Sequence, residues 1–137
     1  MLETILIDSG PLIALFDKDD SYHGRIKNFL KDRRFRFLTT TAVLTEVSHM
    51  LDFSTDVQLL FLKWVHKGAV LLHEIQQSDM GRIIELTRKY SDIPMDFADA
   101  TLVLAAEKTG IRKIISIDSD FDIYRLPGKV SIENVFR

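Results

Sequence analysis

The sequence contains no cysteine, which excludes disulfide bonds and metal sites built on thiolates. It has only three prolines and six glycines, and no repeat, low-complexity segment or Pro/Gly-rich linker divides it. At 137 residues, we therefore expect a single domain over residues 1–137. The hydrophobic content of 46% and the charged content of 28% are typical of a folded globular chain.

Long apolar runs are also absent. No segment approaches the roughly 18 apolar residues that a membrane-spanning helix needs, and no basic segment precedes the apolar residues at the N-terminus. We expect no membrane association and no secretory signal, and a cytoplasmic location is the default. The net charge is only −2, so a nucleic-acid partner would have to be held by local basic patches or bound cations. The most basic segment, KDRRFR at 31–36, is interpreted as a helix end and a solvated turn.

Strand and helix patterns alternate along the chain. Apolar runs predict strands at 3–8, 34–40, 69–75 and 112–117, with a weaker last strand at 129–136. Helical spacing or end signals predict helices starting at Pro11 and Ser78, and others over 21–33, 41–51, 56–67 and 95–110. The threonines at 39–41 are expected to cap the helix over 41–51. This alternation predicts the α/β class, as a three-layer α/β/α sandwich with a mainly parallel central sheet.

Four acidic residues occupy element ends or apolar faces. Asp8 and Asp118 each end an apolar strand pattern, and if those strands are neighbours their carboxylates lie on the order of 5 Å apart. Glu46 borders the apolar stripe of its helix. Asp99 lies on the most apolar helix in the chain, where an acid rarely occurs without a partner. Ligands of such sheets collect beyond the carboxyl ends of the strands, so the four acids are candidates for one site.

Each acid also has a purely structural interpretation. Asp8 is placed to cap a helix, and Asp96 with Asp99 resembles a capping box. Asp118 is placed to form an Asx turn, and Glu46 to bend outward into water. For Asp96 alone we favour the structural interpretation.

Converging carboxylates repel one another, and a bound cation relieves that repulsion. Two unit charges about 4 Å apart cost about 4 kcal/mol at an effective dielectric constant near 20. Carboxylate oxygens are the ligands that Mg²⁺ and Mn²⁺ prefer, and Mg²⁺ usually retains several waters. Such a site suits the hydrolysis of phosphodiester bonds.

Four segments together resemble the PIN domains, and among them the small single-domain ribonucleases of the VapC toxin type. These segments are ILIDSGPLIALF, LTTTAVLTEVSHML, FADATLVLAAEKTG and IISIDSDF. The resemblance implies an endoribonuclease that depends on Mg²⁺ or Mn²⁺. It also implies a homodimer and an inhibitory antitoxin as partners, besides the RNA substrate.

The family's acidic residues can be carried over position by position. The implied catalytic and metal-binding quartet is Asp8, Glu46, Asp99 and Asp118, with Asp96 and Asp120 as secondary metal ligands. Many family members rely on only one of the last two acids in the chain, and we favour Asp118 over Asp120 because it is expected to end a strand. Ser116 stands where the family commonly has threonine and keeps the hydroxyl group.

Other functional classes fit less well. The Asp118-Ser-Asp120 motif resembles that of haloacid-dehalogenase-type phosphatases, but fewer than twenty residues follow it. A phosphoacceptor receiver domain would need an aspartate ending the central strand and a lysine ending a later one, and the chain lacks both. The alternative that stays open is a catalytically inactive PIN-like module that binds RNA or protein.

Overall fold

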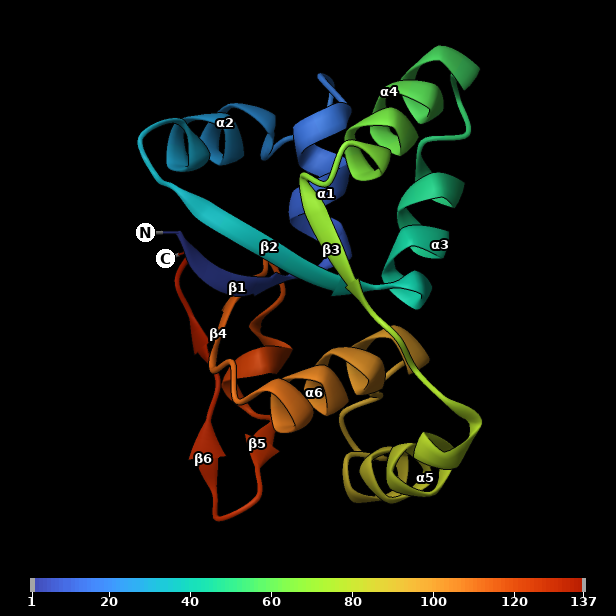
Figure 1. Ribbon diagram of the computed structural model, residues 1–137, viewed down its shortest axis with the longest axis vertical. Helices are drawn as coiled ribbons and strands as arrows, with labels where there is room; N and C mark the ends of the chain where they lie inside the picture. Colours follow the sequence, from blue (N-terminus) through green and yellow to red (C-terminus); the bar gives the residue numbers. More distant parts are fainter. Residues whose placement is uncertain (1, 137) are drawn as a thin grey trace.

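The computed structural model describes residues 2–136, and a five-stranded parallel sheet forms its centre (Figure 1). The strand order is β3-β2-β1-β4-β7, and every neighbouring pair is parallel. The strands are β1 (Glu3–Ile7), β2 (Phe35–Thr40), β3 (Val70–His73), β4 (Lys113–Ile115) and β7 (Glu133–Asn134). The predicted parallel sheet is therefore confirmed, and the strand that directly precedes Asp8 lies next to the strand that precedes Asp118.

Helices cover both faces of this sheet, as the predicted sandwich requires. In Figure 1, α1, α2 and α4 lie on one side, and α5 and α6 on the other. The bounds are α1 (Ser9–Phe16), α2 (His23–Lys31), α3 (Thr41–Met50), α4 (Thr55–His66), α5 (Met80–Lys89) and α6 (Phe97–Thr109). Helix α3 starts directly after β2, so its first turn lies beyond the carboxyl ends of the strands and contacts α6 there. These two helices thus border the edge at which ligands of parallel sheets collect.

The core is built on β1 and α6. Ile5, Leu6 and Ile7 of β1 are completely buried because this strand has a neighbour on each side and helices on both faces. Helix α6 has nine consecutive buried residues, Ala98 to Ala106, which confirms the expectation of a helix that is apolar on nearly every side. Gly110 ends it in the left-handed conformation, with φ +77. Both elements that carry the most deeply placed acids are therefore rigidly held.

Several predicted element starts are corrected. The first helix begins at Ser9 rather than Pro11, because the Asp8 side chain accepts a hydrogen bond from the Ser9 N–H and caps it. The segment around Ser78 is a 3₁₀ turn, η1 (Gln77–Asp79), that precedes α5. This turn is closed by Gln76 and Asp79, whose side chains form a capping box.

The predicted last strand over 129–136 is wrong as a single element. Residues Val130–Ser131 form β6, which pairs with β5 (Arg125–Leu126) in a separate antiparallel hairpin. Glu133–Asn134 then form β7 in the main sheet. Gly128 and Lys129 both have positive φ angles and reverse the chain, which ties the first half of the segment to the hairpin.

The threonines at the end of β2 do not cap α3 as predicted. The structure gives the N-cap residue, Thr40, no side-chain bond to the helix. Its hydroxyl instead pairs with the Thr101 hydroxyl at 2.7 Å, and the Thr39 hydroxyl donates to the Ile7 carbonyl at 2.8 Å. These buried bonds fix β2 to α6 and to the end of β1, the two elements next to the acidic residues.

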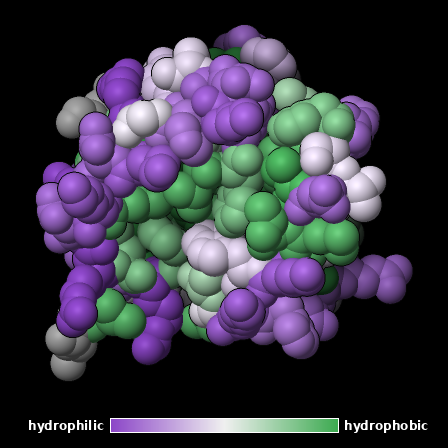
Figure 2. Space-filling model, turned by 90° about the horizontal axis from the view of Figure 1, so that it is seen from above, coloured by the Kyte–Doolittle hydropathy of each residue, from purple (hydrophilic) through white to green (hydrophobic). Residues whose placement is uncertain are grey.

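The surface carries one basic segment and one apolar segment of interest. The segment 31–36 leads into the first residues of β2, so it lies at the amino edge of the sheet, opposite the acidic residues. Large apolar side chains are exposed on α4 and just before it: Phe53, Leu59, Leu60 and Leu62. The face seen in Figure 2, from above α1, α2 and α4, shows apolar groups gathered in a hollow with hydrophilic groups around it. No helix within residues 2–136 has the length and apolar content needed to cross a bilayer.

Candidate active site

Asp8 lies directly beyond the last residue of β1. Its N–H donates to the Ile115 carbonyl of β4 at 3.0 Å, which extends the strand pairing by one residue. Its carboxylate accepts hydrogen bonds from the Ser9 N–H at 2.8 Å and the Ser116 hydroxyl at 3.0 Å. The side chain is only 6% exposed, so sheet, helix and loop all hold it in place.

Asp99 lies in the first turn of α6 and is 7% exposed. Its carboxylate accepts a hydrogen bond from the Tyr124 hydroxyl at 3.0 Å, and Tyr124 is completely buried. Its N–H donates to the Asp96 carboxylate at 2.8 Å, so Asp96 is the N-cap of the helix, as its structural interpretation predicted. The cap fixes the first turn of α6 and thereby the direction of the Asp99 side chain.

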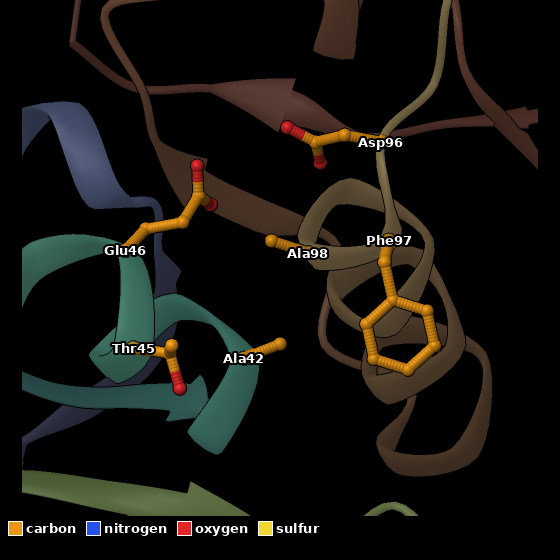
Figure 3. Close-up of a pocket in the computed structure, with 6 residues that line it drawn as sticks. All are labelled: Ala42, Thr45, Glu46, Asp96, Phe97 and Ala98. Carbon is orange, nitrogen blue, oxygen red and sulfur yellow. The ribbon is translucent and has the colours of Figure 1, made fainter. Parts of the chain in front are cut away.

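Glu46 and Asp96 line one cavity from opposite sides. The cavity has a volume of about 410 Å³ and is bordered by α3 and the start of α6: Ala42, Thr45, Glu46, Asp96, Phe97 and Ala98. In Figure 3 the carboxylates of Glu46 and Asp96 point toward the same space, whereas the Phe97 ring points away from them. Glu46 is half-buried, so the prediction that it borders the apolar face of its helix is confirmed.

Asp118 does not end a strand, contrary to the prediction. Strand β4 ends at Ile115, and Asp118 caps the 3₁₀ turn η2 (Ser119–Asp122) by accepting a hydrogen bond from the Asp120 N–H. The sheet pairing stops because the Ser116 N–H bonds to the Asn134 side chain instead. The Ser116 hydroxyl accepts from the Asp118 N–H at 3.0 Å and donates to Asp8, so it links the two acids.

The electrostatics place these acids near one another. Burial, followed by the charges of Asp8 and Asp96, raises the pKa of Asp99 to about 8. Burial raises the pKa of Asp8 to about 6, although hydrogen bonds from Ser9 and Ser116 oppose this shift. Burial, with the charges of Asp96 and Asp8, also raises the pKa of Glu46. Each shift shows that the ionised carboxyl lacks a compensating positive charge.

Asp120 belongs to the outer part of this acidic group. Its pKa is raised by burial and by the charges of Asp118 and Asp96. The charges of Asp8 and Asp99, the two inner acids of the group, are not among the causes of that shift. The charge of Asp118, in contrast, raises the pKa of both inner acids. This difference favours Asp118 over Asp120 as the fourth acid, and that choice stays a prediction.

The donor set fits a hard divalent cation. All the side chains are carboxylates, and a cation among them would offset both their burial and their repulsion. Within residues 2–136, no three His, Cys, Asp or Glu side chains are yet arranged closely enough to hold an ion. Glu46 and Asp118 lie on the more exposed rim of this group of acids.

Sequence reasoning missed Tyr124 as a member of this site. The tyrosine is separated from Asp99 by 25 residues and lies just after η2, in a segment without a clear pattern. The one available signal was a lone tyrosine close behind the Asp118–Asp120 loop, which does not by itself indicate contact with an acid. Its hydroxyl supplies the partner that a buried acid requires.

The sequence matches the PIN domain family over residues 5–126. The chain belongs to this family. That confirms the resemblance inferred from the four acidic segments, each of which lies largely or wholly within the matched range.

Individual relatives agree with this assignment. The chain is 22% identical over 116 residues to ribonuclease VapC26 of Mycobacterium tuberculosis, covering 83% of this chain and 86% of that protein. Its fold is similar to that of VapC20 from the same organism, described as a toxin that cleaves the sarcin-ricin loop. That similarity has a TM-score of 0.78 at 20% identity over 87% of this chain and 93% of the other. VapBC2 of Rickettsia felis, solved bound to a fragment of its promoter DNA, gives a TM-score of 0.62 at 12% identity over 96% and 98% of the two chains. The VapC-type PIN fold predicted from the sequence is therefore confirmed.

Proposed function

We propose that this PIN domain is a divalent-metal-dependent endoribonuclease that hydrolyses RNA phosphodiester bonds. The observation that carries the proposal is the pair of buried carboxyls, Asp8 and Asp99, which have raised pKa values and face further acids at the carboxyl edge of the sheet. A site that holds uncompensated carboxyls in this way loses stability unless it binds a cation. The names of the relatives, which are ribonucleases and toxins, support the choice of RNA as the substrate.

Asp8, Asp99 and Asp118 would hold the ion, with Glu46 at its more exposed side and Asp96 and Asp120 as secondary ligands. A bound Mg²⁺ or Mn²⁺ would neutralise charge on the scissile phosphate and lower the pKa of a water molecule. Asp8 and Asp99 enter the site as fixed ligands because each is oriented by hydrogen bonds, from Ser116 and Tyr124 respectively. This arrangement reduces the reorganisation that ion binding requires.

Glu46 is suited to a different task from the inner acids. It is half-buried on α3 and has a flexible three-bond side chain that faces the cavity. From this position its carboxylate can accept a hydrogen bond from the attacking water and orient it toward the phosphorus. Its pKa is raised toward neutral pH, and a carboxylate with a pKa nearer the operating pH is a more effective general base.

We further propose that the chain is the toxin of a type II toxin–antitoxin pair and acts in the cytoplasm. The support is the VapC-type names of the relatives, and the VapBC2 structure of Rickettsia felis shows that one such protein is found in a VapBC assembly. Expression of the chain alone should slow bacterial growth, whereas expression of D99N should not. Equal growth with both would contradict the toxin role.

We propose a homodimer whose contact includes the exposed apolar side chains of α4. Leu59, Leu60 and Leu62 are each at least 44% exposed, which is unusual for neighbouring leucines on one helix. Light scattering at micromolar concentration should give twice the chain mass of 15.8 kDa. A monomeric mass would contradict this part of the proposal, and L60D should produce that mass if α4 forms the contact.

RNA cleavage assays with added Mn²⁺, Mg²⁺ or a chelator test the central proposal. The wild-type protein should cut single-stranded RNA with either ion and stop when EDTA is added. Full activity in both D8N and D99N would refute the assignment of the site. Binding of RNA without any cleavage would instead favour the catalytically inactive module.

A further inference from the structure

A second polar cavity lies at the same edge of the sheet, beside the acidic site. It has a volume of about 160 Å³ and lies between the start of α2 and the ends of β4 and β7. The residues around it are Tyr22, Arg25, Ser116, Ile117, Ser119 and Asn134, with Phe136 behind them. Ser116 connects the two sites, because its hydroxyl donates to the Asp8 carboxylate.

Arg25 is held over two aromatic rings in this cavity. Its guanidinium carbon lies 5.0 Å from the centroid of the Tyr22 ring and 5.2 Å from that of Phe136. Stacking fixes the plane of a guanidinium group but leaves the N–H groups at its edge able to donate. Within residues 2–136, Arg25 forms no ion pair and donates no hydrogen bond.

Neutral donors line the same cavity. Ser119 is exposed at the start of η2, and within the described residues its hydroxyl has no hydrogen-bond partner. The Asn134 amide nitrogen gives one N–H to the Ser116 carbonyl at 2.9 Å, which leaves its second N–H available. An oriented cation with hydroxyl and amide donors beside it is the chemistry that recognises a phosphate group.

A site built from acidic residues needs positive charge close by if it is to hold RNA, which is a polyanion. The two cavities on the α3 and α6 side are lined by no lysine or arginine, and the basic segment 31–36 lies at the opposite edge of the sheet. Arg25 supplies positive charge in the neighbouring cavity, which shares Ser116 with the acidic site, and forms no ion pair with the acids.

We propose that Arg25, Ser119 and Asn134 form a binding site for an RNA phosphate next to the scissile one. The inference rests on the proposed ribonuclease function and adds to it the group that holds the substrate backbone. Binding at such a site would be independent of base identity, because a phosphate group carries no sequence information.

The test measures binding of a short fluorescein-labelled single-stranded RNA by fluorescence anisotropy. All variants carry D99N so that the RNA stays intact, and binding is measured over a series of salt concentrations. R25M keeps an aliphatic chain over the two rings but removes the charge, so we expect Kd to rise about tenfold. The slope of log K against log [salt] should decrease in magnitude by about 0.7, the value for one phosphate contact with a single strand.

K27M is the matched control. Lys27 lies on the same helix and borders a different cavity, with Leu15 and Leu30. K27M removes the same charge as R25M but outside the proposed phosphate site, and it should therefore leave Kd within about twofold and the salt slope unchanged. An equal effect of K27M and R25M would overturn the proposal, since it would indicate a diffuse attraction. A loss of affinity in R25M without a change in slope would also overturn it, since it would indicate a structural role.

Further variants cover the case in which R25M does not fold. R25K should keep the salt slope but bind about threefold more weakly, because it lacks the planar fork of donors. S119A should also weaken binding by about threefold, through the loss of one hydrogen bond. Unchanged binding in both would overturn the proposal.

Cleavage by the wild-type preparation separates this inference from the proposed function. Arg25-dependent binding by a protein that never cleaves RNA would refute the ribonuclease and leave the phosphate site standing. Cleavage by the wild type combined with unaltered binding in R25M would refute the phosphate site alone.

Discussion

Asp79 and Asp99 are two buried aspartates that precede or open a helix, yet their surroundings are opposite. Asp79 accepts a hydrogen bond from the Gln76 N–H at 2.9 Å and pairs with Lys108 at 2.9 Å. These contacts lower its pKa. Asp99 has one neutral partner, Tyr124, and other acids around it, and its pKa is raised to about 8.

The comparison teaches that burial alone does not identify a functional acid. Asp79 has every partner that it needs and stabilises the fold by closing the turn before α5. Asp99 lacks a positive partner, so its position costs stability in the absence of a bound ion. The balance of charge around each acid distinguishes a structural from a functional role.

The largest expected difference between Asp99 and Asp79 is in the rate of RNA cleavage after each acid is replaced by asparagine. D99N should reduce metal-dependent RNA cleavage by a factor on the order of 10³, because it removes a charged ligand from the centre of the site. D79N should retain the wild-type rate per folded molecule, because Asp79 lies outside the acidic group. Cleavage assays with fixed amounts of folded protein measure both. Comparable losses in the two variants would mean that the acids do not differ in role.

The rise in Tm caused by a bound metal ion should also differ between the D79N and D99N variants. Mn²⁺ at about 100 times its Kd should stabilise the wild-type protein by about 2.7 kcal/mol, which corresponds to a rise in Tm of several degrees. D79N should show the same rise from a lower starting point, and D99N should show little or none. Differential scanning fluorimetry with and without Mn²⁺ measures the shifts. No rise in the wild type at millimolar Mn²⁺ would favour the inactive module.

The metal-free proteins should change stability in opposite directions. D99N should raise Tm, because asparagine keeps an acceptor for the Tyr124 hydroxyl and removes the repulsion. D79N should lower Tm by several degrees, because the ion pair with the exposed Lys108 and the turn that starts at Gln76 both depend on the buried Asp79 carboxylate. Thermal melts in EDTA decide the point, and a lower Tm in D99N would count against uncompensated charge at Asp99.

The smallest expected difference between Asp79 and Asp99 is in how each makes the free energy of unfolding depend on pH. A carboxyl whose pKa is raised in the folded state contributes stability that is present below its unfolded pKa, near 4, and is lost as the pH rises through the folded value. In EDTA the free energy of unfolding should therefore fall between pH 4 and about 6 through Asp8, and up to about 8 through Asp99. The limiting slope is about 1.4 kcal/mol per pH unit for each carboxyl. Asp79, with its lowered pKa, has the opposite sign and acts only at lower pH.

Urea titrations at several pH values measure this slope. D99N should flatten the profile between pH 6 and 8, whereas D79N should leave it unchanged in that range. A profile in D99N that matches the wild type would show that another group causes the slope.

The sequence predicts the parallel sheet well, and it predicts that Asp8 lies at the carboxyl edge of the sheet and Asp99 on a buried helix, because strong local patterns surround both residues. Buried strands and the apolar helix over 95–110 have clear periodicity, and Asp8 and Asp99 interrupt them at places where an acid is costly. The catalytic roles of these acids stay predictions. The pattern weakens after Ile115, where the expected strand through Ile117 gives way to a loop and the last strand divides between two sheets.

The residues that sequence reasoning missed act through long-range contacts. Tyr124 reaches Asp99 only after η2 has turned the chain, and Lys108 reaches Asp79 only when α5 packs on α6. Arg25 stacks on the ring of Phe136, which lies more than a hundred residues away in the sequence. Such pairs depend on tertiary packing, which no local spacing encodes.

Ser116 has a further consequence for how the site adapts to its ion. Asp8 is fixed by a strand and Asp99 by a capped helix, but the backbone of Asp118 is tied to this arrangement through one hydroxyl group. If the site binds a metal ion as proposed, Asp8 and Asp99 would set a nearly constant spacing, and the loop over 117–122, which carries the exposed Asp118, would adjust to the ionic radius. Discrimination between Mg²⁺ and a larger ion such as Ca²⁺ would then reside in the length and stiffness of that loop rather than in the sheet.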